Sequence, residues 1–306
     1  MNRSIWLSGS RGFVGAQVAN ILRSSGYDIK CLSNSPSNDK DVIYTDFSDR
    51  RQIRKTLMEH GALDTFIHLG WGDVYQPHSE EHLTTNLQNG INLVDEFFDL
   101  GVDRFVLIGS SSEYGERVGA LTENLGPEGL VNNYVKGKTA LAQYGLDAAE
   151  RHKKKFIHVR LFYTYGAGQK HNSLINQLFQ SYLEQKAINL SPCEQYRDYI
   201  HLSEAAEGIK QICSVDRSAV INLGGGNVIQ LKEFIKLFWA QLGGDPELLI
   251  FGAHEKPAHE QSQPHAYADL KNLKNLANWS PSLPMKEGIK LTVVQLLAQD
   301  TTPLIV

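Results

Sequence analysis

The sequence predicts the α/β fold class, with a doubly wound parallel sheet followed by a smaller C-terminal α/β lid. Two observations lead to this prediction. Short apolar runs alternate with helix-like segments through the first half of the chain, a pattern typical of βαβ units in a parallel sheet. Beyond about Tyr165 the pattern loosens into helices separated by short strands. Because parallel crossovers are right-handed, helices should cover both faces of the sheet.

The strands of the sheet are expected at residues 4–8, 28–32, 42–44, 65–69, 104–108 and 156–161. Residues 172–184, 203–214 and 231–242 have the periodicity of lid helices. Residues 196–202 and 220–223 have the pattern of strands that rejoin the main body. A clean boundary between body and lid is therefore not expected.

Composition and charge disfavour several classes of protein. The chain has 306 residues, of which 42% are hydrophobic and 21% charged, as in an ordinary globular protein. The formal net charge of −4 provides no basic field for a nucleic acid or an anionic membrane. The N-terminus reaches Ile5, Trp6 and Leu7 without a long apolar segment, and no stretch of spanning length follows. We therefore expect a cytoplasmic protein.

Neither a disulfide framework nor a metal site is expected. The cysteines are odd in number and widely spaced, which fits a reducing compartment; they are Cys31, Cys193 and Cys213. The histidines of a loop rich in Pro and Gln lack i,i+4 spacing and a supporting acid cluster; they are His254, His259 and His265.

A glycine-rich turn follows the first expected strand and opens a helix. Gly9 permits a tight turn, Gly12 lets the backbone approach a pyrophosphate, and Gly15 lets the helix pack closely on the strand. The free amides of this turn, at Phe13 and Val14, would then point at the phosphates. The arrangement predicts that residues 1–165 form a Rossmann dinucleotide-binding domain. Residues 166–306 are expected to be mainly a substrate-binding lid, with some segments returning to the main domain.

The end of the second strand bears on the choice of cofactor. NAD-specific sites place an acid there against the ribose hydroxyls, whereas this chain has Ser33 and Asn34 after Leu32. No carboxylate at that position would repel a 2′-phosphate, so NADP is favoured over NAD. The alternative is that Asp39 or Asp41 substitutes for the missing acid.

Tyr134 and Lys138 are four residues apart, which places them on the same face of a helix. A free phenol, with a pKa of about 10, is a poor acid or base at neutral pH. An adjacent ammonium and a cationic nicotinamide both favour the phenolate, so Tyr134 can act as a proton shuttle. By itself, this spacing also describes an ordinary exposed helix face.

Three serines follow the strand at 104–108, at the edge where an α/β sheet places its sites. A hydroxyl from Ser110, Ser111 or Ser112 would hold the substrate oxygen while Tyr134 exchanges its proton. A serine run alone is typical of a loop. Its place upstream of Tyr134 and Lys138 favours the catalytic interpretation.

Together these residues resemble the extended short-chain dehydrogenase/reductase family, in the group of NAD-dependent epimerases, dehydratases and ketoreductases that act on nucleotide sugars. The resemblance covers nearly the whole chain. Beyond the glycine turn and the Ser-Tyr-Lys set, its pieces are Asp46-Phe47, Phe66-Ile67-His68-Leu69, Asn86-Leu87, Tyr114-Gly115, the run from Arg160 to Gly166, Asn172 to Ile175 and Arg197 to His201.

The resemblance implies roles for the catalytic and cofactor residues. Alignment to Tyr114-Gly115 places the catalytic hydroxyl on Ser110, while Lys138 tunes Tyr134 and holds the cofactor ribose. Arg11 stands where several NADP-dependent members carry an arginine that meets the 2′-phosphate; a solvated surface charge is the alternative. The other implied cofactor contacts are Asp46 and Phe47 at the adenine, and Leu69, Gly70 and Asn86.

For the substrate, the resemblance implies that Arg197 contacts the nucleotide phosphates and that Asn172 and Ser173 do so through the lid. An ion pair of Arg197 with Asp198 or Glu194 is the alternative. Ser111 and Ser112 are also expected near the substrate.

Some residues differ from the family's motifs, and these differences reduce the number of activities expected of the chain. Trp71 stands where the family often has alanine, so an indole is expected to form a wall of the sugar pocket. Tyr163 stands where epimerases have asparagine, which disfavours epimerisation. Ser111 and Ser112 replace the Asp-Glu pair of dehydratases, which disfavours a 4,6-dehydratase.

The favoured hypothesis is therefore NADPH-dependent reduction of a nucleotide-diphosphate-linked 4-keto-6-deoxy sugar. The second hypothesis is a nucleotide-sugar 4-epimerase that retains NAD tightly. A third, of another class, is a non-catalytic NADP-sensing protein. A homodimer is expected from the family alone.

Overall fold

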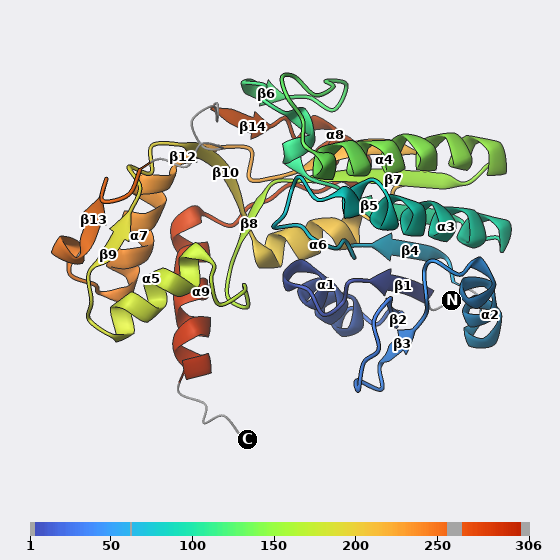
Figure 1. Cartoon of the computed structure of the whole chain (residues 1–306), viewed down its shortest axis with the longest axis horizontal. Coiled ribbons are helices and arrows are strands. Elements are labelled where there is room, and N and C mark those ends of the chain that lie inside the picture. The colour runs from blue at the N-terminus through green and yellow to red at the C-terminus, as the bar shows by residue number, and fades with distance from the viewer. Residues whose placement is uncertain (1–3, 62, 256–264, 301–306) are drawn as a thin grey trace.

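The main body is a seven-stranded parallel sheet with the spatial order β11-β7-β5-β4-β1-β2-β3 (Figure 1). The computed structural model describes residues 4–61, 63–255 and 265–300. The strands of the sheet are β1 (Ser4–Ser8), β2 (Asp28–Ser33), β3 (Val42–Tyr44), β4 (Thr65–His68), β5 (Arg104–Ile108), β7 (Lys155–Leu161) and β11 (Ala219–Leu223). Each of the six strands expected in the first half of the chain is present to within one residue at either end. The predicted α/β fold class and Rossmann-type sheet are confirmed.

Successive side chains of each strand point to opposite faces of the sheet, and large apolar side chains on each face form a separate core. Ile5 and Leu7 of β1 belong to one core, whereas Trp6 belongs to the other. In β5, Val106 and Phe105 divide in the same way. Strands buried on both faces are expected when helices cover a parallel sheet on both sides.

Three helices cover each face (Figure 1). On the face of Leu7 lie α1 (Phe13–Ser24), α6 (Leu202–Ile212) and α8 (Lys271–Ala277). On the face of Trp6 lie α2 (Arg50–His60), α3 (Thr85–Asp99) and α4 (Asn133–His152). Helices α6 and α8 come from the second half of the chain, so that half contributes to the main core.

The lid has its own core, in which Phe234, Phe238 and Trp239 are buried. Its helices are α5 (Leu174–Leu183), α7 (Leu231–Leu242) and α9 (Met285–Asp300). Two of its strands pair in parallel, β9 (Ile188–Leu190) and β13 (Leu249–Phe251). In Figure 1 this body lies to the left of the main sheet, and α6 lies between them.

Shorter strands connect the two bodies. A three-stranded sheet is formed by β12 (Val228–Gln230), β10 (Tyr196–His201) and β8 (Tyr163–Tyr165). A two-stranded sheet is formed by β14 (Ala266–Ala268) and β6 (Gly119–Leu121). Short 3-10 turns occupy η1 (Glu80–His82), η2 (Ser111–Tyr114) and η3 (Pro246–Leu248).

The two strands expected to rejoin the main body behave differently. β11 joins the main sheet beside β7, as expected. β10 pairs with β8 and β12 in the connecting sheet instead, although its Ile200 is buried in the main core. Among the helices of the described residues, none has both the length and the apolar character needed to cross a membrane.

Candidate active site

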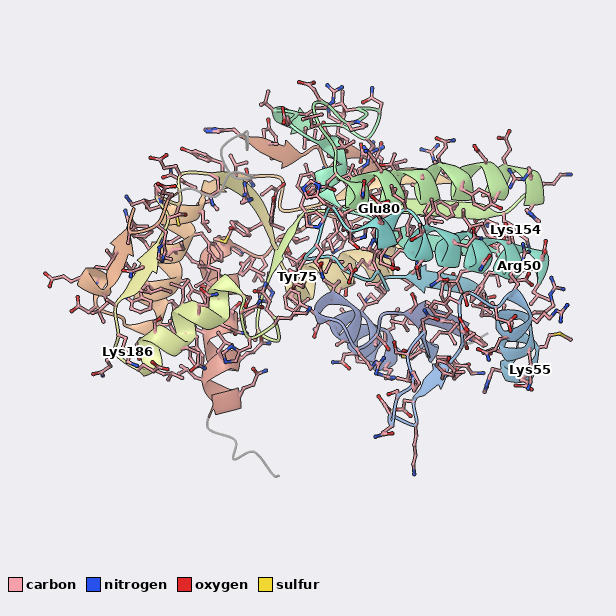
Figure 2. The ribbon with its side chains drawn as sticks, in the orientation of Figure 1. Arg50, Lys55, Tyr75, Glu80, Lys154 and Lys186 are labelled. Carbon is pink, nitrogen blue, oxygen red and sulfur yellow. The ribbon has the colours of Figure 1, made fainter. Side chains whose placement is uncertain are left out.

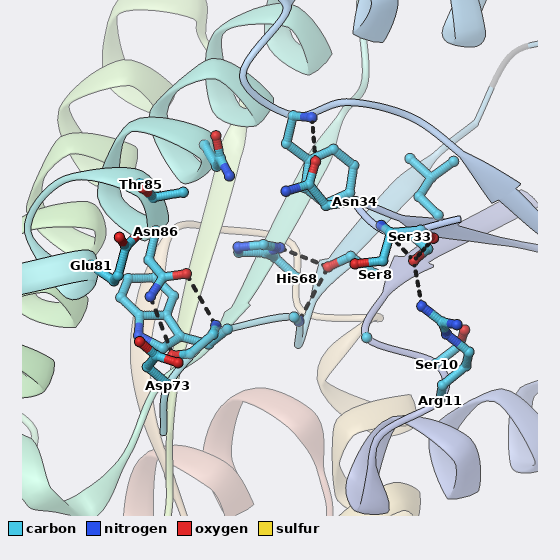
Figure 3. Close-up of a pocket in the computed structure, with 18 residues that line it drawn as sticks. Ser8, Ser10, Arg11, Ser33, Asn34, His68, Asp73, Glu81, Thr85 and Asn86 are labelled. Carbon is cyan, nitrogen blue, oxygen red and sulfur yellow. Dashed lines mark hydrogen bonds between the residues drawn. The ribbon is translucent and has the colours of Figure 1, made fainter. Parts of the chain in front are cut away.

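A cavity of about 680 Å³ lies at the carboxyl ends of β1, β2 and β4. This edge is where open α/β sheets bind their ligands. The cavity is lined by the glycine turn after β1, the end of β2, the segment after β4 and the first turn of α3 (Figure 3). Of the residues predicted to bind cofactor or substrate, it collects Gly9, Arg11, Ser33, Asn34, Phe47, Gly70, Trp71 and Asn86.

The glycine turn is built so closely that side chains are excluded from it. Gly9 has a φ of 77°, and a Cβ there would lie 2.6 Å from the amide nitrogen of Gly70. A Cβ on Gly15 would lie 2.0 Å from the carbonyl oxygen of Gly9. Helix α1 begins after Gly12, and no side chain caps it. An uncapped helix start behind a tight glycine turn fits the pyrophosphate of a dinucleotide.

Several predicted cofactor residues lie outside the cavity lining. Gly12, Phe13, Val14 and Gly15 belong to the turn and the start of α1 that support it. Leu69 packs against the main core. Their predicted contacts with a cofactor remain predictions.

Arg11 reaches from the glycine turn to the end of β2. Its Nη2 donates to the Oγ of Ser33 at 2.8 Å, and both residues line the cavity (Figure 3). The Oδ1 of Asn34 accepts from the amide of Phe47 at 2.7 Å. A guanidinium, a hydroxyl and an amide side chain therefore border this end of the cavity, where an NAD-specific site would have a carboxylate.

Asp46 is turned toward its own loop. Its Oδ1 accepts from the hydroxyl and the amide of Ser48, at 2.7 and 2.8 Å, and these bonds lower the pKa of Asp46. It is not part of the cavity lining, whereas the neighbouring Phe47 is. The adenine contact expected for Asp46 stays a prediction.

His68 is a buried residue of the cavity for which no role was expected from the sequence. Its Nδ1 lies 2.7 Å from the Oγ of Ser8, which also accepts from the amide of Gly70 at 3.3 Å (Figure 3). Burial, followed by the nearby ammonium of Lys138, lowers the pKa of His68 to about 3. The imidazole is therefore neutral at physiological pH.

The structure brings the three predicted catalytic residues together. The side chain of Asn132 caps α4 by accepting from the amide of Val135 at 3.0 Å. The helix then directs Tyr134 and Lys138 toward the end of β5, where Ser110 lies. The hydroxyl of Ser110 is close enough to the phenol of Tyr134 to lower the pKa of Tyr134. The Nζ of Lys138 lies 5.9 Å from the centre of the Tyr134 ring.

Burial controls the proton affinities of the pair. It raises the pKa of Tyr134 to about 12, against the nearby hydroxyl of Ser110, which lowers it. It also lowers the pKa of Lys138 to about 7. The expected lowering of the Tyr134 pKa by Lys138 is not seen in the chain alone, where desolvation of the phenolate dominates. The positive charge of an oxidised nicotinamide is the remaining contribution expected to favour the phenolate.

Trp71 connects the catalytic pair to the cavity. The Nζ of Lys138 donates to the carbonyl of Ile108 at 2.7 Å and lies 4.2 Å from the centre of the Trp71 ring. The indole Nε1 donates to the Nδ1 of His82 at 3.0 Å. Because that Nδ1 accepts, the proton of His82 is on Nε2, which donates to the carbonyl of Gln76 at 3.0 Å.

Helix α4 comes close enough to hold this arrangement in place. A Cβ on Gly137 would lie 2.3 Å from the carbonyl oxygen of His82 and 3.3 Å from the Trp71 ring. Asn86 supports the same segment, since its amide group exchanges hydrogen bonds with the backbone of Gly72. Because Gly137 has no side chain, the indole of Trp71 can lie beside Lys138 against helix α4. No motif in the sequence indicates that His82 takes part.

The predicted substrate residues of the lid lie away from this cavity lining. The guanidinium of Arg197 is buried and stacks 4.6 Å from the centre of the Tyr163 ring. The carboxylate of Asp198 accepts from the backbone amides of Gly225, Gly226 and Ala268, and the ion pairs of the described residues do not include Arg197. Ser173 caps α5, and the carbonyl of Asn172 accepts from Gln177. Their contacts with a substrate remain predictions.

One contact spans the two bodies of the molecule. Tyr75, in the segment after β4, lies between the main body and the lid in Figure 2. The ammonium of Lys170, which precedes α5, lies 4.2 Å from the centre of its ring. Among the described residues, no group of three or more His, Cys, Asp or Glu side chains is placed to hold a metal ion. His259 lies outside the described residues.

The fold and the site define a dinucleotide-dependent enzyme of the Rossmann type. The family model described as the NAD dependent epimerase/dehydratase family matches residues 5–224, and the chain belongs to this family. It is therefore an NAD(P)-dependent enzyme of the extended short-chain dehydrogenase/reductase type, as the sequence motifs indicated.

Two relatives align over nearly the full chain. A UDP-glucuronate 4-epimerase from Thermodesulfobacterium geofontis is 25% identical over 94% of each chain. A dTDP-6-deoxy-L-talose 4-dehydrogenase (NAD(P)(+)) from Kitasatospora kifunensis is 23% identical over 96% of this chain and 95% of the relative. Among solved structures, the UDP-glucuronic acid 4-epimerase of Bacillus cereus, in complex with UDP-glucuronic acid and NAD, is 20% identical. It has a TM-score of 0.77 and covers 97% of this chain and 99% of its own.

Proposed function

We propose that the chain uses NADPH to reduce the 4-keto group of a 4-keto-6-deoxy sugar linked to a nucleoside diphosphate. The pair of Arg11 and Ser33 at the end of β2 carries this proposal. A guanidinium there suits the 2′-phosphate that distinguishes NADP from NAD. A reductant that is consumed in each turnover fits a net reduction, whereas an epimerase regenerates its cofactor within the turnover.

The Ser-Tyr-Lys set supplies the proton chemistry of this reaction. NADPH, when bound, supplies the hydride that converts the ketone carbon into an alcohol carbon. Ser110 holds the ketone oxygen by a hydrogen bond, and Tyr134 donates its phenolic proton to that oxygen. The high pKa of Tyr134 keeps the phenol protonated and ready to donate. Solvent then returns a proton to the phenolate, and Lys138 holds the ribose of the cofactor.

In this reaction the sugar would lie beside Trp71 and the nucleotide under the lid. The indole lines the cavity and also faces Lys138, so it would form the wall between the sugar and the cofactor. Ser111 and Ser112 follow Ser110 on the same turn and would contact the sugar. Arg197 would bind the diphosphate, and Asn172 and Ser173 would close over it. The dTDP-6-deoxy-L-talose 4-dehydrogenase is a relative whose name describes the reverse oxidation on a deoxy sugar.

The test is a panel of nucleotide-linked 4-keto-6-deoxy sugars, each incubated with NADPH or NADH while the absorbance of the reduced nicotinamide is followed. We expect oxidation of NADPH with at least one sugar and a lower kcat/KM with NADH. A panel on which neither cofactor is oxidised would reject the proposal.

A 4-epimerase that retains NAD is the second candidate, supported by the epimerase relatives and by the NAD in the similar Bacillus cereus structure. Bound NAD would accept a hydride from the sugar and return it to the other face after the ketose has rotated, while the same three residues would move the proton. The absorbance spectrum of the purified protein separates the two. Bound NAD that survives purification, together with interconversion of two nucleotide sugars without added cofactor, would favour this candidate.

A further inference from the structure

Behind Ser110 lies a buried carboxylate to which neither the sequence motifs nor the proposed reaction gives a role. Glu113 belongs to η2, and its side chain is 0% exposed. Its Oε1 accepts from the backbone amide of Ser110 at 2.8 Å. The Oγ of Ser110 in turn accepts from the amide of Ser112 at 3.1 Å. Glu113 and Ser110 thus form a reciprocal capping box at the start of this short turn.

Two basic side chains of β7 lie against the carboxylate, although its Oε2 accepts no hydrogen bond and the bond from His158 Nε2 goes to Oε1 at 3.2 Å. The Nε2 of His158 lies 3.1 Å from Oε2, and the Nε of Arg160 lies 3.4 Å from the same atom. His158 is 2% exposed and Arg160 8%. A Cβ on Gly109 would lie 2.3 Å from both Glu113 Oε1 and His158 Nε2, so the backbone before Ser110 is pressed against this cluster.

Glu113 holds the backbone amide of Ser110, two residues after Ile108, whose carbonyl accepts from the Nζ of Lys138 at 2.7 Å. The negative charge of Glu113 raises the pKa of Lys138 and the pKa of Tyr134. The other titratable groups around Lys138 are His68 on β4, Tyr134 on α4 and, behind the Trp71 indole, His82 on η1. None of these three supplies a negative charge at neutral pH, because imidazole is neutral or cationic and the phenol is protonated.

We propose that Glu113 is a positioning residue of the active site, which anchors the Ser110 turn through its backbone amide and provides the buried counter-charge of the Lys138 ammonium. Stability alone is a weak reason for such a cluster, because a buried ion pair is often replaced by apolar residues at little cost. The cluster lies directly behind the catalytic turn, and this location indicates that the cluster positions the turn. This inference rests on the roles proposed for Ser110, Tyr134 and Lys138, and it holds for either reduction or epimerisation.

The direct test observes Lys138 rather than turnover. In protein labelled with ¹³C at the lysine ε-carbon, one resonance should titrate near neutral pH, and its absence from the Lys138→Met protein assigns it. Glu113→Gln retains an acceptor for the Ser110 amide and removes the charge. We expect it to lower the midpoint of this titration by about one pH unit, because the ammonium loses its counter-charge.

Glu96→Gln is the matched control, because Glu96 is also a buried carboxylate with two basic side chains against it. It accepts from Arg50 and Arg54 on α2, at 2.7 Å each, away from the catalytic turn. We expect no change in the Lys138 midpoint in this variant. An unchanged midpoint in Glu113→Gln, or an equal change in both variants, would overturn the role of Glu113 as a counter-charge.

The Glu113→Asp variant tests whether Glu113 anchors the Ser110 turn. This variant remains informative if Glu113→Gln does not fold. The shorter side chain keeps the charge and withdraws the acceptor from the Ser110 amide. We expect the Lys138 midpoint to stay within a few tenths of a unit and kcat to fall on the order of tenfold, with KM for the nucleotide sugar unchanged. A wild-type kcat in this variant would overturn the anchoring role. Because the resonance is read without substrate, failure of the proposed reaction and failure of this inference are distinguishable.

Discussion

The ammonium of Lys138 lies 4.2 Å from the centre of the Trp71 indole ring, which itself lines the cavity at the ends of β1, β2 and β4. Lys138, which is proposed to act beside Tyr134, is therefore covered on one side by an aromatic face. Arg197, which is predicted to contact the substrate, has the same kind of partner, since it stacks on Tyr163. Both aromatic residues stand at positions where the sequence departs from the family pattern. The two departures thus share one physical effect, the stabilisation of a buried cation.

Truncation of the indole should weaken catalysis through Lys138. We expect Trp71→Ala to lower kcat/KM about tenfold, because a desolvated cation–π contact is worth about 1–2 kcal/mol. Trp71→Phe keeps a ring face and should retain most of the rate. Initial rates at several substrate concentrations measure both. Equal losses in the two variants would show that the ring face is not the source of the effect.

Arg11 should decide between the two dinucleotides. We expect Arg11→Ala to weaken NADPH binding by about 10-fold to 100-fold, because it removes charge-assisted hydrogen bonds to the 2′-phosphate. NADH binding should change little. Calorimetric titration of both cofactors measures this, with Lys55→Ala on the exposed surface of α2 as the control. Similar losses for NADPH and NADH would remove the basis for NADP preference.

His68 should make the protein sensitive to acid. Its folded pKa of about 3 is below its ordinary value of 6.5, so the unfolded chain binds the proton more readily. Its contribution to stability is therefore fully present above about pH 6.5 and is lost as the pH falls toward 3, on the order of 1 kcal/mol per pH unit.

The measurement is the free energy of unfolding in urea at about pH 7.5 and about pH 5, for the wild type and for His68→Asn. We expect the difference between the two pH values to be smaller in the variant. His201, whose pKa is lowered to about 4 by burial, contributes equally to both proteins and cancels. The same pH dependence in both would exclude His68 as a source of acid sensitivity.

Gly137 should be intolerant of a side chain despite its place inside a helix. At an exposed helical position, alanine is more favourable than glycine by about 1 kcal/mol. Here the Cβ would lie 2.3 Å from the carbonyl of His82, so we expect Gly137→Ala to lower the stability by about 1–3 kcal/mol. Gly126→Ala, which meets nothing within 4 Å, is the control. Thermal unfolding compares them, and a stabilised Gly137→Ala protein would contradict the close approach of η1.

Local sequence patterns were sufficient to predict the sheet and the proximity of the three predicted catalytic residues. The alternation in β1 assigns Ile5 and Leu7 to one face and Trp6 to the other. Helical spacing put Tyr134 and Lys138 on one face, and the strand end put Ser110 opposite them. β10 was less predictable because its pairing with β8 and β12 depends on partners distant in the chain.

The surroundings of the site could not be predicted in the same way. Glu113 meets His158, which is 45 residues further along, only because β5 and β7 are neighbours in the sheet. His82 reaches Trp71 through a turn with no motif of its own. The proton affinity of Tyr134 follows from burial, which the sequence does not display, and this is why the expected acidic phenol is absent from the chain alone. The spacing of residues in the sequence predicts which side chains come into contact. The pKa values of these side chains depend instead on the structure that surrounds them.

The central claim is that this site transfers hydride from NADPH to a sugar ketone while Tyr134 supplies the proton. It is tested most directly with NADPH deuterated at the transferable position of C4 and a nucleotide-linked 4-keto-6-deoxy sugar. We expect one deuterium on C4 of the product sugar, with one NADPH oxidised per product, and no product from the Tyr134→Phe protein. A product sugar without deuterium, formed while NADPH stays reduced, would contradict the account.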